Sequence, residues 1–376
     1  MHPHKVLIVD DSAFMRRLIS DLIREDPQFE VVGTARNGKE ALDKMAVLKP
    51  DVVTLDVEMP EMNGLDALGE IMRASPVPVI MLSGRPDDTI HSLELGAVDF
   101  ILKPSGPISL DLHVIKEELL SKLRTAVTSN ISGLGGEQQA RHQPADAGVP
   151  AAPAALSSEI PAAEVKRGRP SGKSPPGSGP EEFSHLVAIG SSTGGPRALQ
   201  SVLTRLPADF PAPILIVQHM PPKFTLSLAQ RLDSLSRIRV VEAADGEPVH
   251  PGTAYIAPGG MHMRLVRDQQ YRVRLTMEEP RAGHRPSVDV LFESLLPFDS
   301  LQLHAVLLTG MGSDGAQGML QLKRQASAST IAQSEESCVV YGMPRCAVEL
   351  KCVDHILPVD EVAEKLIQLT AMKRTG

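Results

Sequence analysis

The sequence contains no tryptophan and only three tyrosines among 376 residues, and its formal net charge is -8. A nucleic-acid-binding surface usually combines positive charge with aromatic side chains on which bases stack. This composition therefore argues against nucleic acid as a partner.

Cysteine and long apolar runs are also scarce. Three cysteines occur, all near the C-terminus and without a Cys-x-x-Cys pair, at Cys338, Cys346 and Cys352. Their odd number argues against a disulfide framework, and their spacing argues against structural zinc. No stretch reaches the ~18 apolar residues of a membrane span, and the N-terminus lacks the apolar stretch of a signal peptide. We therefore expect a cytoplasmic protein with no membrane insertion. We also expect it to be a monomer.

The overall composition is that of a folded protein, with 42% hydrophobic and 22% charged residues. At ~100–200 residues per domain, the length predicts two domains. Between them lies a segment rich in alanine, proline, glycine and serine, which cannot bury enough surface to offset its ordering entropy. We expect domains at 1–127 and 183–376 and a flexible linker at 128–182. Its basic cluster, Lys166–Arg169, is interpreted as solvated linker, with an interaction patch as the alternative.

Both domains alternate short apolar runs with amphipathic stretches, which is typical of parallel sheets wrapped by helices. In the first domain, five strands are predicted at Val6–Asp10, Phe29–Ala35, Asp51–Asp56, Val77–Ser83 and Val98–Leu102. In the second, six are predicted at His185–Gly190, Ile214–Gln218, Arg239–Glu242, Thr253–Ile256, Leu303–Leu308 and Thr330–Ala332. A hairpin, Met263–Arg267 with Tyr271–Met277, interrupts the second pattern. The predicted fold class is α/β, with two doubly wound domains and a mostly parallel second sheet.

Polar residues gather at the ends of the first domain's strands. Asp10 and Asp11 follow the first strand, Asp56 the third, Ser83 the fourth and Lys103 the fifth. In a parallel open sheet these ends meet at one edge, where ligands bind. Three carboxylates there repel one another unless a hard cation such as Mg²⁺ lies between them. Singly, these residues suggest a helix N-cap and a turn, but together they favour a phosphoryl-accepting site.

With the run Met59–Gly64 added, residues 5–127 resemble a receiver domain of two-component signalling, a five-stranded flavodoxin-like fold. The resemblance implies that Asp56 is the phosphoacceptor. It also implies that Asp11 and Asp56 bind Mg²⁺ with the backbone carbonyl of Glu58, while Asp10 assists through water.

The same resemblance assigns three further positions. Ser83 and Lys103 would be switch residues that contact the phosphoryl group. Phe100 occupies the position of the rotating aromatic. These residues would couple phosphorylation to a change on the domain surface.

The second domain opens with a strand that runs into a glycine-rich turn. The stretch Gly190–Gly194 has the Gly-x-Ser-x-Gly spacing that holds a serine, here Ser192, exposed above a sheet. Two other interpretations stay open: Ser192 or Thr193 caps a helix with Pro196 in its first turn, or the glycines bind a phosphate. No lysine follows the glycines, so a nucleotide P-loop is not indicated.

Two more polar residues are predicted at the same sheet edge. His219 directly follows the next strand, where a general base can reach the hydroxyl of Ser192. Asp314 follows a later strand and can fix the imidazole tautomer, although it can equally cap the next helix. The order Ser, His, Asp differs from the α/β-hydrolase order of Ser, Asp/Glu, His, so that fold is not indicated.

Because of these motifs, residues 183–372 resemble the catalytic domain of the chemotaxis protein-glutamate methylesterases, the CheB family. Other matching motifs are Tyr255–Gly260, His284–Asp289, Thr309–Gly315 and Tyr341–Pro344. His284 and Arg285 would either face the substrate or belong to a loop that leads into a helix.

The resemblance assigns the roles of the site residues. Ser192 would be the nucleophile, His219 the base and Asp314 the orienting acid. The backbone near Met311 and Thr193 would support the oxyanion. The family often has alanine at the position before the nucleophile. This sequence has Ser191 there, which is a second nucleophile candidate next to Ser192.

The implied function is phosphorylation-activated hydrolysis of glutamate methyl esters on methyl-accepting chemoreceptors, with release of methanol, and deamidation of receptor glutamines. The family implies a histidine kinase of the CheA type as phosphodonor, Mg²⁺ for phosphorylation and no cofactor for the esterase step. One rival hypothesis is a phosphorylation-switched binding protein with an idle second domain. Another is a DNA-binding response regulator, for which no basic recognition helix is present.

Overall fold

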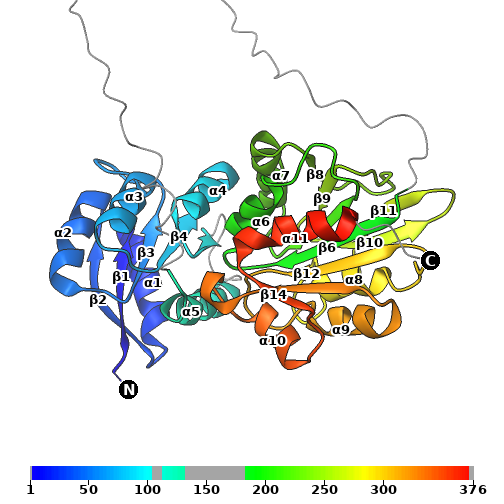
Figure 1. The fold of residues 1–376 in the computed structure, drawn as a ribbon. Coiled ribbons are helices and arrows are strands. Elements are labelled where there is room, and N and C mark those ends of the chain that lie inside the picture. Colours follow the sequence, from blue (N-terminus) through cyan, green and yellow to red (C-terminus); the bar gives the residue numbers. More distant parts are fainter. Residues whose placement is uncertain (1, 104–111, 132–182, 372–376) are drawn as a thin grey trace, which may run out of the picture.

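The computed structural model describes residues 2–103, 112–131 and 183–371, which form two α/β domains lying side by side (Figure 1). Residues 132–182 of the predicted linker, including Lys166–Arg169, lie outside the described residues. The domain and linker bounds therefore stay a prediction. Within the described ranges, no helix combines the length and apolarity needed to cross a bilayer.

The N-terminal domain is a five-stranded parallel sheet, which confirms the predicted architecture. Its strands are β1 (His4–Val9), β2 (Phe29–Ala35), β3 (Val52–Asp56), β4 (Val79–Ser83) and β5 (Asp99–Leu102). Its helices are α1 (Ala13–Arg24), α2 (Gly38–Leu48), α3 (Gly64–Ala74), α4 (Pro86–Leu95) and α5 (Leu112–Val127). The spatial order β2-β1-β3-β4-β5 is the flavodoxin-like one, and its ligand-binding edge lies at the carboxyl ends of β1 and β3.

Local sequence explains where these helices begin. Ser12, Asn37 and Asn63 accept hydrogen bonds from the backbone amides of α1, α2 and α3, groups that would otherwise lack partners. A Cβ at Gly64 would lie 1.9 Å from the carbonyl oxygen of Asp56. Only glycine therefore lets α3 start directly against the end of β3.

The C-terminal domain contains a seven-stranded parallel sheet of order β14-β13-β12-β6-β7-β9-β8. Its strands are β6 (His185–Ser191), β7 (Ile214–Gln218), β8 (Arg239–Glu242), β9 (Thr253–Ile256), β12 (Gln302–Leu307), β13 (Ser329–Gln333) and β14 (His355–Leu357). Its helices are α6 (Gly195–Leu203), α7 (Phe224–Leu235), α8 (Val288–Ser294), α9 (Ala316–Gln325), the 3₁₀ helix η1 (Glu335–Ser337), α10 (Met343–Glu349) and α11 (Val359–Ala371). Strands β6, β7 and β12 are neighbours, so their carboxyl ends meet at one edge.

Two details differ from the predicted second domain. The sequence pattern missed β14, a three-residue strand at the sheet edge. The hairpin, β10 (His262–Arg267) with β11 (Tyr271–Thr276), forms a separate two-stranded antiparallel sheet. The large sheet is therefore parallel in all of its described pairings.

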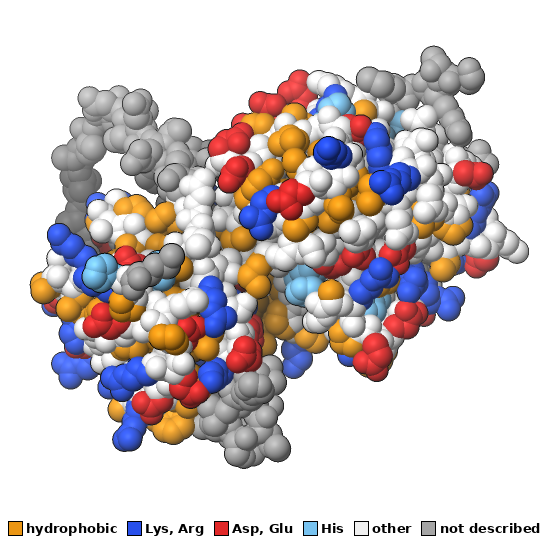
Figure 2. Space-filling view, turned by 90° about the horizontal axis from the view of Figure 1, so that it is seen from below, with side chains coloured by type: hydrophobic (Ala, Val, Ile, Leu, Met, Phe, Trp, Pro, Cys, Tyr) orange, Lys and Arg blue, Asp and Glu red, His pale blue; other side chains and the backbone are white. Residues whose placement is uncertain are grey.

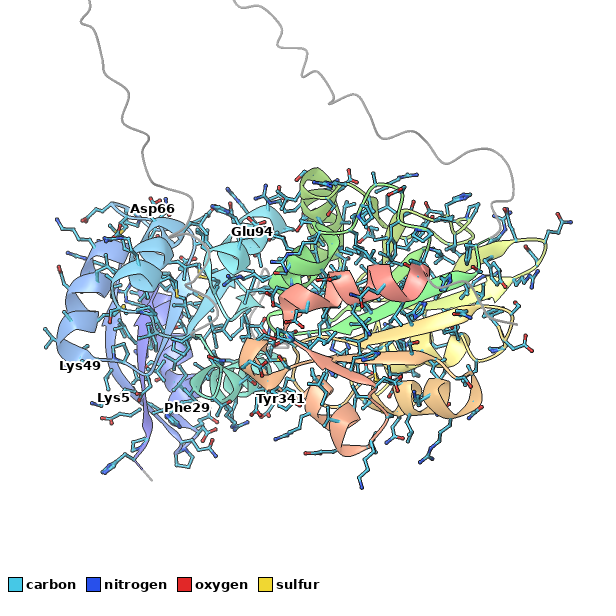
Figure 3. The ribbon with its side chains drawn as sticks, in the orientation of Figure 1. Lys5, Phe29, Lys49, Asp66, Glu94 and Tyr341 are labelled. Carbon is cyan, nitrogen blue, oxygen red and sulfur yellow. The ribbon has the colours of Figure 1, made fainter. Side chains whose placement is uncertain are left out.

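The two domains are packed together through α4 and β5 of the first and α6 and α7 of the second. The rings of Phe100 and Phe224 stack across this contact with centroids 5.1 Å apart, and both side chains are buried. Glu94 accepts two bonds from Arg231, at 2.6 and 3.0 Å. Figure 3 shows Glu94 on α4, on the side that faces the C-terminal domain. An apolar stack and an ion pair thus hold the domains together.

This packing predicts that Phe224→Ala loosens the docked arrangement. Loss of a buried phenylalanine costs about 3–5 kcal/mol, part of which falls on the contact with Phe100. The radius of gyration from small-angle X-ray scattering should increase. The control Leu226→Ala, on the same helix and 45% exposed, should leave it unchanged.

Arg231→Gln is a milder companion variant that removes only an exposed ion pair, worth about 1 kcal/mol or less. It should shift the scattering curve in the same direction by less. An unchanged curve for Phe224→Ala, with circular dichroism intact, would contradict the proposed contribution of the ring stack.

Candidate functional site

Ser192 lies at the carboxyl end of β6, in a tight turn that leads into α6. Its backbone N–H donates to the carbonyl of Thr309 (3.0 Å), and its own carbonyl accepts from the N–H of Gly195 (2.8 Å). The neighbouring Ser191 is fully buried, and its hydroxyl donates to Gln218 Oε1 at 2.7 Å. Ser192 is partly exposed and lines a cavity. Of the two adjacent serines, only Ser192 is accessible.

The helix-capping interpretation of this turn is wrong. The N-cap of α6 is Gly194, with φ 77°, and no side chain caps the helix. Behind the turn, a Cβ at Gly310 would lie 2.7 Å from Ser192 Cβ and 2.4 Å from Met343 Sδ. The glycine at position 310 therefore lets the β12 loop approach the backbone of Ser192 closely.

His219 follows β7 and bonds to Asp314. The backbone N–H of His219 donates to the carbonyl of Ser191 (3.0 Å), which ties the two strand ends together. Nε2 of His219 lies 2.8 Å from Asp314 Oδ2. Asp314 does not cap α9, whose N-cap is Gly315 without a side-chain bond. The structure therefore brings together the predicted base and orienting acid.

Asp314 is held by the first turn of α8. Its Oδ1 accepts from the Ser287 hydroxyl (2.8 Å) and the Asp289 N–H (3.0 Å), and its Oδ2 accepts from the Val288 N–H (2.7 Å). Burial by itself raises the pKa of Asp314, but the bonds from His219 and these amides outweigh it and lower the pKa to about 2. The carboxyl is therefore ionised at neutral pH.

An ionised carboxylate only accepts hydrogen bonds, so Nε2 of His219 carries the proton toward Asp314. The other ring nitrogen, Nδ1, then has a free lone pair. It is buried and has no hydrogen-bond partner among the described residues. His219 and Ser192 line the same cavity, although within the described chain no hydrogen bond joins them. The contact predicted between these two side chains is thus not formed here.

His284 covers the imidazole of His219. The two rings stack with centroids 3.9 Å apart and planes 5° from parallel. Burial and the nearby His219 lower the pKa of His284 to about 4, so His284 is neutral at pH 7. Arg285 donates to the carbonyls of Met277 and Glu278, at 3.2 and 3.0 Å. Both residues line the cavity, which favours the substrate-facing interpretation of this loop.

The two residues predicted to support an oxyanion contact the N-terminal domain. The Thr193 hydroxyl donates to Asp99 Oδ2 at 2.6 Å. The Met311 side chain is 44% exposed, and its sulfur is contacted by the hydroxyl of Thr125 on α5. The oxyanion role of Thr193 and Met311 remains a prediction.

A cavity of about 480 Å³ lies between the two domains at this edge. The space-filling view from below shows hydrophobic and histidine side chains near the boundary of the domains (Figure 2). The cavity lining includes Asp99, Phe100 and Lys122 from the first domain and Ser192, His219 and His284 from the second. The N-terminal domain therefore covers the C-terminal site without filling it.

Sequence reasoning missed two residues that organise the site. Gln218 accepts from Ser191 and donates to the carbonyls of Ser192 (2.9 Å) and His219 (3.1 Å). Ser287 donates to the buried carboxylate that orients His219. The signal for Gln218 was a polar residue at the end of a buried apolar strand. Ser287 had no such signal, because serine is common in loops.

The edge of the N-terminal sheet gathers the predicted acidic cluster. Oxygens of Asp10, Asp11 and Asp56 lie within 4.8 Å of one another. Lys103 Nζ lies 3.0 Å from Asp10 Oδ2 and 2.6 Å from Asp56 Oδ2. Burial raises the pKa of Asp56 to about 6, although Lys103 opposes this. A cluster of carboxylate oxygens next to one ammonium fits a hard divalent cation such as Mg²⁺.

The other predicted receiver residues lie around this cluster. The Ser83 hydroxyl is buried and donates to the carbonyl of Arg85 at 3.1 Å. The Glu58 carboxylate pairs with Arg85 at 2.8 Å, and Glu58 lines a surface pocket together with Asp11. Phe100 points away from solvent into the domain contact. Their switch and ligand roles remain predictions.

Comparisons with known proteins show which families this chain resembles. Two family models match the chain, CheB methylesterase over residues 187–366 and Response regulator receiver domain over residues 6–115. A relative from Geobacillus kaustophilus, named protein-glutamate methylesterase/protein-glutamine glutaminase, is 50% identical over 371 residues, covering 97% of this chain and 98% of the relative. A relative from Bacillus subtilis with the same name is 44% identical over 375 residues, covering 98% and 99%.

A solved structure also matches part of the chain. The crystal structure of the Thermotoga maritima CheB methylesterase catalytic domain has a TM-score of 0.48 and 45% sequence identity. It covers 50% of this chain and 100% of that domain.

The close approach of Gly310 to Ser192 predicts a sensitive position. In Gly310→Ala, the new methyl group displaces Ser192 or Met343, and a misplacement of ~1 Å can cost about 100-fold in rate. On the predicted role of Ser192 as nucleophile, we expect its phosphonylation by a fluorophosphonate, measured by intact-protein mass spectrometry, to slow by at least about tenfold. Gly69→Ala, where a Cβ meets nothing within 4 Å, is the control. Unchanged labelling would contradict the role given to this contact.

Proposed function

The chain belongs to the protein-glutamate methylesterase/protein-glutamine glutaminase family, and from this premise we propose that its C-terminal domain hydrolyses glutamate methyl esters on methyl-accepting chemoreceptors. Deamidation of receptor glutamines is proposed as a second reaction of the same site. The observation that carries the proposal is the bond between His219 and Asp314 beside the accessible Ser192. A nucleophile, a base and an orienting carboxylate are the groups that acyl transfer requires.

In the proposed reaction, Ser192 Oγ attacks the ester carbonyl carbon and its proton passes to Nδ1 of His219. Backbone N–H groups near Met311 and Thr193 stabilise the oxyanion. The intermediate collapses, and the leaving oxygen takes the proton from His219 and departs as methanol. Water then attacks the acyl-enzyme with His219 again as base, which releases the glutamate carboxylate and restores Ser192. From a glutamine, the leaving group is ammonia.

The assignment of Nδ1 as the proton acceptor follows from the ionised Asp314. Because Asp314 accepts from Nε2, the catalytic proton must enter and leave through the other ring nitrogen. The low pKa of Asp314 keeps this tautomer in place over the neutral range. Ser192 and His219 line the same cavity, and a catalytic hydrogen bond of this kind often tightens only when a substrate binds.

Asp56 is the proposed phosphorylation site, with a CheA-type histidine kinase as donor. Asp11 and Asp56, with the backbone carbonyl of Glu58, would hold Mg²⁺, and Asp10 would assist through water; the ion would neutralise charge on the incoming phosphoryl group. The short distances among the three carboxylates support this assignment. Lys103, already in contact with Asp56, would bind the phosphoryl oxygens.

The docked domains support steric control of the esterase. Residues of β5 and α5 line the cavity over Ser192, so a receptor helix cannot lie against the site while they are in place. Phosphorylation of Asp56 would draw Ser83 and Lys103 inward and reposition Phe100. Because Phe100 stacks on Phe224, that movement would weaken the docking directly.

Substitution of the two adjacent serines tests the nucleophile. Ser192→Ala should lower demethylation of methyl-labelled receptor by at least about 10³-fold, because the attacking oxygen is lost. The matched control Ser191→Ala removes only a bond to Gln218 and should keep most of the activity. Methanol release measures both. Equal loss in the two variants, or retained activity in Ser192→Ala, would overturn the assignment.

The regulatory proposal predicts how the receiver domain sets the rate. Asp56→Ala should keep the full chain at its low basal rate and abolish the response to a phosphodonor in Mg²⁺, because no acyl phosphate forms. Deletion of residues 1–127 should raise the basal rate, since nothing then covers Ser192. Receptor demethylation measures both changes. A deletion variant no faster than the unphosphorylated full chain would exclude steric inhibition.

A further inference from the structure

The cavity over Ser192 has room for a small substrate while the two domains are docked. We propose that the unphosphorylated enzyme, with its receiver domain docked, already hydrolyses small γ-glutamyl methyl esters at Ser192, so that docking excludes receptor helices but not free esters. The inference rests on the proposed function of Ser192. It adds a second substrate class and makes the control by phosphorylation depend on substrate size.

The volume of the closed site supports this selectivity. The cavity measures about 480 Å³ with both domains in place, within the range of roughly 300–1,000 Å³ that is typical of small-ligand pockets. A capped glutamate methyl ester is smaller than most ligands of such pockets. A receptor helix is about 10–12 Å across with its side chains and would need the space that β5 and α5 now occupy.

The cavity also reaches solvent while the domains are docked. Ser192 and Thr193 stay partly exposed although the receiver domain packs over them. Two loops of the C-terminal domain also supply exposed lining residues, Gly283 in one loop and Met311 with Gly312 in the other. Because several lining residues are open to solvent, the cavity can admit a small molecule without separation of the domains.

The predicted base and its orienting acid are already paired while the domains are docked. The bond between His219 and Asp314 is formed at 2.8 Å, and Asp314 keeps all of its α8 donors. Docking therefore blocks the approach of a large substrate and does not dismantle the base and its orienting acid. A mechanism that disordered these groups would slow every ester equally, whereas obstruction slows only substrates that are too large.

The test compares two substrates on the full chain. The small probe is N-acetyl-glutamate γ-methyl ester N-methylamide, the large one is methyl-labelled receptor, and each is assayed with and without acetyl phosphate and Mg²⁺. We expect kcat/KM for the small ester to change by less than about twofold, because its binding does not distinguish the two states. The rate on receptor should rise by at least about fivefold.

A variant pair tests whether the ester enters this cavity. Ser121 lines the cavity from α5, so Ser121→Phe should slow the small ester several-fold without a phosphodonor. The control Glu117→Phe lies on the same helix, is exposed and does not line the cavity, and it should have no effect. Unchanged turnover in Ser121→Phe, with receptor demethylation still low, would overturn entry by this route.

The remaining outcomes separate this inference from the proposed function. If phosphorylation accelerates both substrates equally, or if only receptor is ever hydrolysed, size-selective access is wrong while Ser192 can still be the nucleophile. If Ser192→Ala hydrolyses the small ester at the full rate, the proposed nucleophile itself is wrong.

Discussion

The buried carboxylate of Asp314 is the interaction on which the catalytic geometry depends. A charge in a protein interior is stable only when hydrogen bonds replace its water, and here the Ser287 hydroxyl, the His219 ring and two amides of α8 do so. The positive end of the α8 dipole adds to this stabilisation. Because the carboxylate stays ionised, it decides which nitrogen of His219 holds the proton. The first residues of α8 thus determine the protonation of the histidine that would activate Ser192, a residue at the end of another element.

Much of the fold could be predicted because strands buried on both faces appear as continuous apolar runs. The bounds of β2, β7, β8 and β9 agree with the structure at both ends. The edge strand β14 was missed because it has three residues, one of them exposed, and so shows no apolar run. Periodicity also identified the hairpin strands, but it carries no information about which sheet they join.

The position of the candidate site could also be predicted, but only part of its contacts could. Strand order alone places Ser192, His219 and Asp314 at one edge, and the structure bears out the contact of the last two. The Gly-x-Ser-x-Gly spacing favoured Ser192 over Ser191, and the structure agrees in burying Ser191 while leaving Ser192 partly exposed. The hydrogen bond from Thr193 to Asp99 could not be predicted from the sequence, because a contact between domains depends on the shapes of two folded surfaces.

The stack of Phe100 on Phe224 couples the two domains, so a change in either domain can affect the other. If phosphorylation weakens the docking, thermodynamic reciprocity requires that docking weakens phosphorylation by the same free energy. On that condition the C-terminal domain would also regulate its own switch, because packing against Phe100 would favour the unphosphorylated form of the receiver domain. A large substrate that displaced the receiver domain from the catalytic face would shift the same equilibrium toward the phosphorylated form.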